Sequence, residues 1–247
     1  MAQPVHAGPP PAALASLVAT AWPGAAVTGR ATLQVRLQEG VGRGVERLHL
    51  TGRQAPTSCI LKWRNDRPDD REGLLYARVL DGALLAPALH GRAAVEGVLL
   101  LLLEDVPGRP LDAHNQNARD LALHALGRAH AASHRRILQA RAGNVAALVR
   151  PGEEPAARVL AELHLAGANA RGMPVAADPD VFDQGDLRPE NVLVDPGAGR
   201  TWIVDYENAA VRPRSAALAP LLRGAHGWPP GPAAQRAWQA YLAGWSA

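Results

Sequence analysis

Alternating hydrophobic and polar positions mark the first hundred residues of the chain. The segments 31–37 and 45–50 alternate with a period of two, and 58–63 carries a third short apolar stretch. Patterns of this length predict β-strands, with a glycine-rich turn between the first two. The unbroken apolar run at 98–103 predicts a further, buried strand. The N-terminal part of the chain is therefore expected to be rich in β-structure.

Helical spacing takes over after residue 108. Apolar residues recur every three to four positions over 112–140, and 153–170 and 231–244 are further helix candidates. Shorter helices are expected at 13–20 and at 69–81, where acidic residues suit the positive end of the helix dipole. The C-terminal part is therefore expected to be mainly helical.

These two patterns predict an α+β protein with two lobes. The expected parts are a small β-rich N-terminal lobe over residues 1–103, a hinge at 104–108 and a larger helical lobe over 109–247. Within the larger lobe, 192–195 and 201–204 read as two short strands joined by a Pro-Gly-Ala-Gly turn, which predicts a hairpin.

Composition narrows the class of protein. The 247 residues are 47% hydrophobic, which is enough for one large domain or two modest ones. A net charge of +3 with 4% aromatic residues lacks the basic stripe and aromatic residues of a nucleic-acid-binding protein. No apolar run is long enough for a membrane span, and the N-terminus lacks a signal-peptide pattern, so a cytoplasmic protein is expected. The single cysteine, Cys59, is expected to be a buried thiol.

Lysine is almost absent from the chain. Of 26 basic residues, only Lys62 is a lysine. A compositional preference for arginine explains the other positions, so a specific requirement at position 62 is indicated. Arginine and lysine are not interchangeable where a compact charge must fit a narrow site.

The predicted hairpin brings polar side chains together. If its strands pair antiparallel, Asn191 and Asp205 meet just beyond their outer ends, and Asp186 lies on the loop that leads into the first strand. Carboxylate and amide oxygens are the ligands that Mg²⁺ shares with substrate phosphates. The sequence therefore predicts a site for a divalent cation here. The alternative is that these are ordinary turn residues that flank a hairpin.

The same segment resembles a known family. Gly185-Asp186-Leu187-Arg188-Pro189-Glu190-Asn191 is similar to the catalytic loop of the aminoglycoside phosphotransferase and choline kinase-like family, whose members are relatives of protein kinases. The resemblance therefore implies that the two expected lobes form a protein-kinase-like fold. Five further segments match the family's pattern in the same order between residues 30 and 210, namely 58–63, 70–76, 102–108, 126–130 and 203–207. Several matches in the right order are far more specific than one.

The resemblance implies a role for each matched residue in a reaction that uses ATP and Mg²⁺. Asp186 is the catalytic residue that orients and deprotonates the acceptor hydroxyl, and Asn191 and Asp205 hold the magnesium. Lys62 contacts the α- and β-phosphates of ATP and pairs with Glu72. Phosphoryl transfer depends mainly on positioning and charge neutralisation, which such a set of groups supplies.

Two further segments are implied to bind the nucleotide. Gly40, Gly42 and Gly44 let a backbone loop approach the phosphates, and the main chain from Glu104 to Val106 hydrogen-bonds adenine. Glycines are also common in plain hairpin turns, so this part of the resemblance is less specific.

Plainer interpretations of the charged pair stay open. Lys62 is alternatively a solvated lysine on a strand, although Ile60, Leu61 and Trp63 around it argue against that. Glu72 is alternatively an acid favoured by the N-terminal end of a helix dipole.

The chain departs from the family's pattern at several positions. Gln184 stands where the family often has a histidine that braces the loop; because glutamine also donates and accepts, weaker bracing is expected. Arg188 and Glu190 replace the common histidine and glycine, and Arg188 is expected to reach a phosphate or to pair with Glu190. The segment 215–219 lacks an acid found in relatives, and the chain after residue 210 is short.

Two functions from different classes follow. The first is a kinase that phosphorylates a hydroxyl of a small molecule, the acceptor being the only expected partner, without nucleic acid or membrane. The resemblance implies a cationic acceptor of the aminoglycoside, choline or amino-sugar type. Four acids could form an anionic pocket for it: Asp178, Asp180, Asp183 and Glu207. The second is a degenerate kinase fold that binds nucleotide and acts as a regulator. Three departures from the family's pattern suggest it: Gln184, the missing acid and the short C-terminal lobe.

Overall fold

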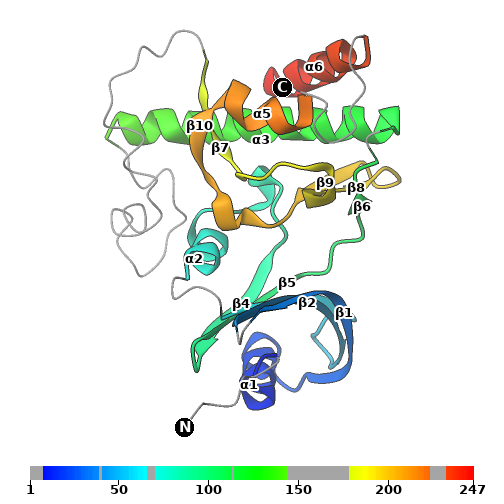
Figure 1. Cartoon of the computed structure of the whole chain (residues 1–247), viewed down its shortest axis with the longest axis vertical. Coiled ribbons are helices and arrows are strands. Elements are labelled where there is room, and N and C mark those ends of the chain that lie inside the picture. The colour runs from blue at the N-terminus through cyan, green and yellow to red at the C-terminus, as the bar shows by residue number, and fades with distance from the viewer. Residues whose placement is uncertain (1–7, 39–40, 66–69, 113, 144–177, 223–231) are drawn as a thin grey trace. The chain divides into compact units, whose positions relative to one another are not determined.

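A computed structural model of the chain describes residues 8–38, 41–65, 70–112, 114–143, 178–222 and 232–247 (Figure 1). The chain divides into two compact units. The first comprises Met1–Gly73 and Pro87–Val106, and the second comprises Leu74–Ala86 and Pro107–Ala247. The first is rich in β-structure and the second is larger and mainly helical, so the α+β class and the two-part architecture predicted from the sequence are confirmed.

The first unit is built on one antiparallel sheet with the strand order β1-β2-β3-β5-β4. Its elements are α1 (Pro11–Ala21), β1 (Ala26–Gln38), β2 (Val41–Thr51), β3 (Ser58–Arg64), β4 (Leu89–Val95) and β5 (Val98–Glu104). The apolar side of α1, with Leu14 and Val18, packs into a core that Leu61 and Leu100 share. Burial of these side chains on both elements holds the helix to the sheet.

Glycines that the sequence placed in a turn lie in a strand. Gly42 pairs with Leu37 and Gly44 pairs with Val35 in the β1–β2 ladder, so both belong to β2. The strands are thus longer than the alternating segments predicted, because the backbone ladder continues through residues whose side chains carry no pattern. Gly40 lies outside the described residues.

The second unit is organised around the long helix α3. Its elements are α3 (Gln116–Arg141), β6 (Arg109–Pro110), β7 (Asp180–Asp183), β8 (Val192–Asp195), β9 (Arg200–Ile203), β10 (Ala210–Pro213), α5 (Arg214–Leu222) and α6 (Pro232–Trp245), with the 3-10 turns η1 (Gly82–Leu84), η4 (Pro189–Asn191) and η5 (Tyr206–Asn208). Helix α3 contacts α6 as well as β7, β8 and β9, and the figure shows it running between them (Figure 1). The helix candidate at 153–170 lies outside the described residues.

Small residues allow α3 and α6 to approach closely. A Cβ on Gly127 would lie 2.2 Å from the carbonyl oxygen of Tyr241, and one on Gly244 would lie 2.0 Å from that of His124. Beside this crossing the buried ring of His130 shares a hydrogen bond of 3.0 Å with the Tyr241 hydroxyl. Burial lowers the pKa of His130 to about 3, so the ring is a neutral packing group.

The predicted hairpin is present, with a register shifted by one residue. Strand β8 pairs with β9 so that Val192 faces Ile203, and the next residue, Val204, donates its N–H to the Asn191 carbonyl at 2.9 Å. Val204 rather than Asp205 is therefore opposite Asn191, and Asp205 follows directly after it.

The segment 74–86 belongs to the second unit, to which several hydrogen bonds tie it. The Tyr206 hydroxyl donates to the Leu84 carbonyl at 2.8 Å, and the Ile203 N–H donates to the Leu85 carbonyl at 2.8 Å. Helix α2 (Arg71–Arg78) consequently starts in the first unit and ends in the second. None of the helices in the described part of the chain is long and apolar enough to cross a membrane.

Candidate functional site

The single lysine forms an ion pair within the first unit. Lys62 lies in the middle of β3, and the residues before and after it in the strand, Leu61 and Trp63, have buried side chains. Its Nζ lies 2.7 Å from Oε1 of Glu72, in the first turn of α2, and the side chains are 14% and 1% exposed. The structure thus brings together the two residues that the sequence paired, and places neither on a solvated face.

Gly44 is explained by packing. A Cβ at this position would lie 2.5 Å from Nε1 of Trp63 on the neighbouring strand. That indole N–H donates to the buried Glu46 carboxylate at 2.9 Å, which in turn binds Arg30 at 2.7 Å. Glycine is therefore needed at position 44 for the indole to lie flat against β2, whether or not a phosphate also approaches there.

We expect Gly44→Ala to lower the stability of the protein by about 1–3 kcal/mol, because the added methyl overpacks against Trp63. Urea unfolding measures this difference. Gly82→Ala is the matched control, because nothing lies within 4 Å of a Cβ at that position. Equal unfolding midpoints for the two variants would contradict the packing role of Gly44.

The segment expected to bind adenine is held by side chains of the sheet. Asp105 accepts hydrogen bonds from Arg47 Nε at 2.7 Å and from the Ser58 hydroxyl at 2.6 Å. The Glu104 N–H donates to the Ala88 carbonyl at 2.8 Å, so this N–H is not available to adenine. Val106, at the end of the unit, is buried. Behind this segment Cys59 is fully buried, and burial raises the pKa of its thiol to about 12.

In the second unit, the backbone of Asp186 is held from both sides. Its N–H donates to Gln184 Oε1 at 2.9 Å. Its carbonyl accepts from the Arg188 N–H at 2.8 Å and from Asn191 Nδ2 at 2.9 Å. The preceding Gly185 has φ +93°, and a Cβ there would lie 2.1 Å from the Asn208 carbonyl oxygen, so the turn requires glycine. The Asp186 side chain is 36% exposed and is therefore accessible to a substrate.

Asn191 and Asp205 fit the oxygen ligands of a magnesium ion. Because Asn191 Nδ2 is committed to the Asp186 carbonyl, its amide oxygen is the atom left for a cation. Asp205 has a left-handed backbone (φ 65°, ψ 63°), which turns the chain at the end of β9. Within the described segments no three His, Cys, Asp or Glu side chains gather as a metal site. Two protein ligands suit Mg²⁺, which keeps water and phosphate oxygens as its other ligands.

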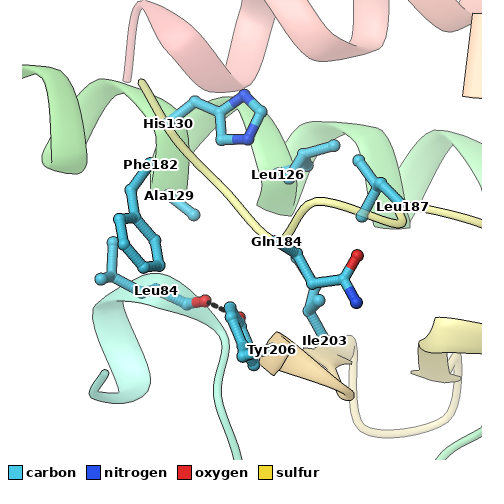
Figure 2. Close-up of a pocket in the computed structure, with 9 residues that line it drawn as sticks. All are labelled: Leu84, Leu126, Ala129, His130, Phe182, Gln184, Leu187, Ile203 and Tyr206. Carbon is cyan, nitrogen blue, oxygen red and sulfur yellow. Dashed lines mark hydrogen bonds between the residues drawn. The ribbon is translucent and has the colours of Figure 1, made fainter. Parts of the chain in front are cut away.

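Gln184 joins the two loops of this site. Its Nε2 donates to the carbonyls of Val204, at 3.0 Å, and Asp205, while its Oε1 accepts from Asp186. The side chain is 3% exposed and lies against a small cavity lined mainly by apolar groups such as Leu187 and Ile203 (Figure 2). Glutamine at this position thus connects the two loops and uses both its donor and its acceptor.

We expect Gln184→Glu to destabilise the protein by about 1–3 kcal/mol, because a carboxylate cannot donate and would face two carbonyl oxygens in a buried place. Urea unfolding of the two proteins tests this. Gln34→Glu, on an exposed position of β1, is the matched control. A Gln184→Glu protein as stable as the control would show that the bridge contributes nothing.

The four acids proposed for an anionic pocket are engaged by other groups. Asp178 binds Arg214 at 3.7 Å and the Ser215 N–H, Asp180 binds Arg141, and Asp183 binds Arg212 at 3.2 Å. Glu207 is buried and also has an interaction partner. The structure therefore gives no support to a pocket of unpaired carboxylates. Arg188 pairs with Asp186, at 2.7 Å, rather than with Glu190.

Comparison with known proteins identifies the fold. No protein-family model and no curated protein matches the chain. Among solved structures it is similar to an aminoglycoside-3'-phosphotransferase of type VIII, with 21% identity, 92% of this chain and 88% of that chain covered, and a TM-score of 0.51. It is also similar to a choline kinase from Cryptosporidium parvum Iowa II, with 14% identity, 86% of this chain and 73% of that chain covered, and a TM-score of 0.53. For macrolide 2'-phosphotransferase type I the identity is 16%, the coverage is 94% of this chain and 81% of that chain, and the TM-score is 0.52.

These structures resemble the chain over most of its length and share the arrangement that its motifs predicted. The chain therefore adopts the aminoglycoside phosphotransferase and choline kinase-like fold.

Proposed function

We propose that the protein is an ATP- and magnesium-dependent phosphotransferase that moves the γ-phosphate of ATP to a hydroxyl of a small molecule. The observation that carries this proposal is the hydrogen-bonded connection of Asp186, Asn191 and the peptide before Asp205 in one loop cluster. The Lys62–Glu72 ion pair in the first unit supports it independently. Neighbours in fold whose names describe phosphotransferases and kinases agree with this class of reaction.

The proposed reaction assigns Asp186 to the acceptor. Its carboxylate holds the acceptor hydroxyl and takes the proton as the hydroxyl oxygen bonds to the γ-phosphorus. The bond from that phosphorus to the β,γ-bridging oxygen breaks, and its electron pair leaves with ADP. Asn191 Oδ1 and the Asp205 carboxylate would hold Mg²⁺, which supplies neutralising charge at the phosphates when it is bound. Lys62, oriented by Glu72, contacts the α- and β-phosphates.

A regulator without turnover is the second candidate. Glutamine at position 184 is one of the departures from the family's pattern that suggest a regulator. The hydrogen bonds of Gln184 to both loops argue against it. The ion pair of Arg188 with the Asp186 carboxylate is the observation that favours it, because the pair engages Oδ2 of the proposed base.

Two measurements on the purified protein separate these candidates. The first is the midpoint of thermal unfolding with and without Mg²⁺-ATP, and the second is ADP release in the presence of pooled hydroxylated compounds. A phosphotransferase is expected to show both a rise in the midpoint and turnover. A rise without turnover on any acceptor would favour the regulator. If the midpoint does not rise and no acceptor is turned over, both candidates are contradicted.

A further inference from the structure

A cation stands directly beside the proposed base. Nη2 of Arg188 lies 2.7 Å from Oδ2 of Asp186, and the two side chains are 43% and 36% exposed, so both reach solvent. Arg188 Nε is buried, so the exposed part of the side chain is the terminal end of the guanidinium. That end is where a group of the acceptor can contact Arg188.

The acids that precede Asp186 in the chain do not supply a free negative charge. Asp178, Asp180 and Asp183 each face an arginine, namely Arg214, Arg141 and Arg212. Each carboxylate is thereby neutralised locally. Arg188 is likewise paired, with Asp186, but 43% of its side chain is exposed. These three paired acids therefore add no free negative charge to attract an ammonium group, whereas Arg188 offers an exposed guanidinium.

This arrangement disfavours a cationic acceptor. An ammonium group within a few ångströms of the reacting hydroxyl would meet the like charge of Arg188. A carboxylate or phosphate group in the same place would instead receive charge-assisted hydrogen bonds from the guanidinium, whose planar fork matches such oxyanions.

We propose that Arg188 binds an anionic group of the acceptor, so that the phosphorylated hydroxyl belongs to an acidic small molecule. This inference rests on the proposed phosphotransferase function and narrows its substrate class. The ion pair with Asp186 lets Arg188 place the acid group of the acceptor next to the carboxylate that takes the hydroxyl proton.

The test uses the protein with two series of related hydroxylated acceptors, each containing an acid, a neutral compound and an amine. One series is glycerate, glycerol and 3-amino-1,2-propanediol, and a second is gluconate, glucose and glucosamine. ADP release gives kcat/KM, and mass spectrometry identifies the phosphorylated product. We expect the acid of at least one series to exceed its neutral analogue by about tenfold or more, as one added charge-assisted contact implies, and the amine to be the poorest member.

Variants locate this preference at Arg188. Arg188→Met is expected to lower kcat/KM for the acid by about 100-fold and to lower it less for the neutral analogue, so that the selectivity falls. Arg200→Met is the matched control, since Arg200 is exposed at the opposite end of the β8–β9 hairpin. It is expected to leave the selectivity unchanged.

Several outcomes would overturn the inference while the phosphotransferase function stands. One is a preference for the amine or the neutral member in both series. Another is an equal loss of kcat/KM for every acceptor in Arg188→Met, because that would place Arg188 on the transferred phosphate. If no acceptor in either series is turned over, thermal unfolding with Mg²⁺-ADP and gluconate or glycerate decides. The lack of a stabilisation that depends on Arg188 would then overturn the inference, whereas no response to Mg²⁺-ATP would refute the proposed function itself.

Discussion

Asp186→Asn is expected to lower turnover by about 10²–10⁴-fold, because the amide cannot take the proton of the acceptor hydroxyl. The variant keeps the size of the side chain, and the backbone contacts of residue 186 to Gln184, Arg188 and Asn191 are made by main-chain atoms. The fold should therefore survive. The loss of the partly exposed ion pair with Arg188 should cost no more than about 1 kcal/mol.

Two measurements and one control make this result specific. Thermal unfolding with Mg²⁺-ATP should show that the variant still binds nucleotide, while ADP release shows the loss of chemistry. Asp195→Asn is the matched control, because Asp195 caps the turn at the opposite end of the hairpin through the Ala198 N–H at 3.1 Å. Undiminished turnover by Asp186→Asn would refute the role given to this carboxylate.

The second large effect concerns the single lysine. Lys62→Arg preserves the charge, and we expect it to reduce kcat/KM for ATP by about 100-fold or more, since a misplaced cation stabilises the transferring phosphates poorly. The groups on the face of the sheet that Lys62 occupies leave little room for a wider guanidinium, because its cross-strand partner Leu101 is buried and the Glu72 side chain is 1% exposed. Steady-state kinetics with varied ATP measures the effect.

Further variants separate charge from stability. Lys62→Met alone leaves the buried Glu72 without its cation and is expected to cost about 3–5 kcal/mol. Lys62→Met with Glu72→Gln removes both charges and should recover much of that stability without recovering activity. Arg36→Lys, on an exposed position of β1, is the control for the exchange of the two residue types. An unchanged KM and kcat for ATP in Lys62→Arg would remove Lys62 from the site.

Local patterns in the sequence predicted the elements that depend on neighbouring residues. Short apolar runs predicted the strands that contain Lys62 and the Leu-rich segment, and helical spacing predicted α3 and α6 within a few residues of their ends. The pairing of Lys62 with Glu72 came from a family motif, and the ion pair at 2.7 Å agrees with it. These features could be predicted because periodicity and spacing are properties of short segments.

Long-range packing decided the rest. The clash that excludes a Cβ at Gly44 comes from Trp63 on another strand. The hairpin register differs by one residue because Asp195 pairs with Arg200, so that the second strand starts one residue earlier than its apolar pattern indicated. The segment 74–86 joined the second unit through hydrogen bonds to Ile203 and Tyr206, more than a hundred residues away. No local pattern encodes which of several distant partners a backbone group meets.

The sequence by itself determined which chemical groups are available for the proposed reaction: a single lysine, a carboxylate on a loop, and an amide and a second carboxylate at the ends of a hairpin. Only the tertiary structure decided how these groups are supported and charged. It gave Gln184 its contacts to both loops, paired the acids Asp178, Asp180 and Asp183 with arginines, and set Arg188 beside Asp186. The physical reason is that the field at a reacting group is the sum of charges brought together by folding, and their distances are not written in the order of residues.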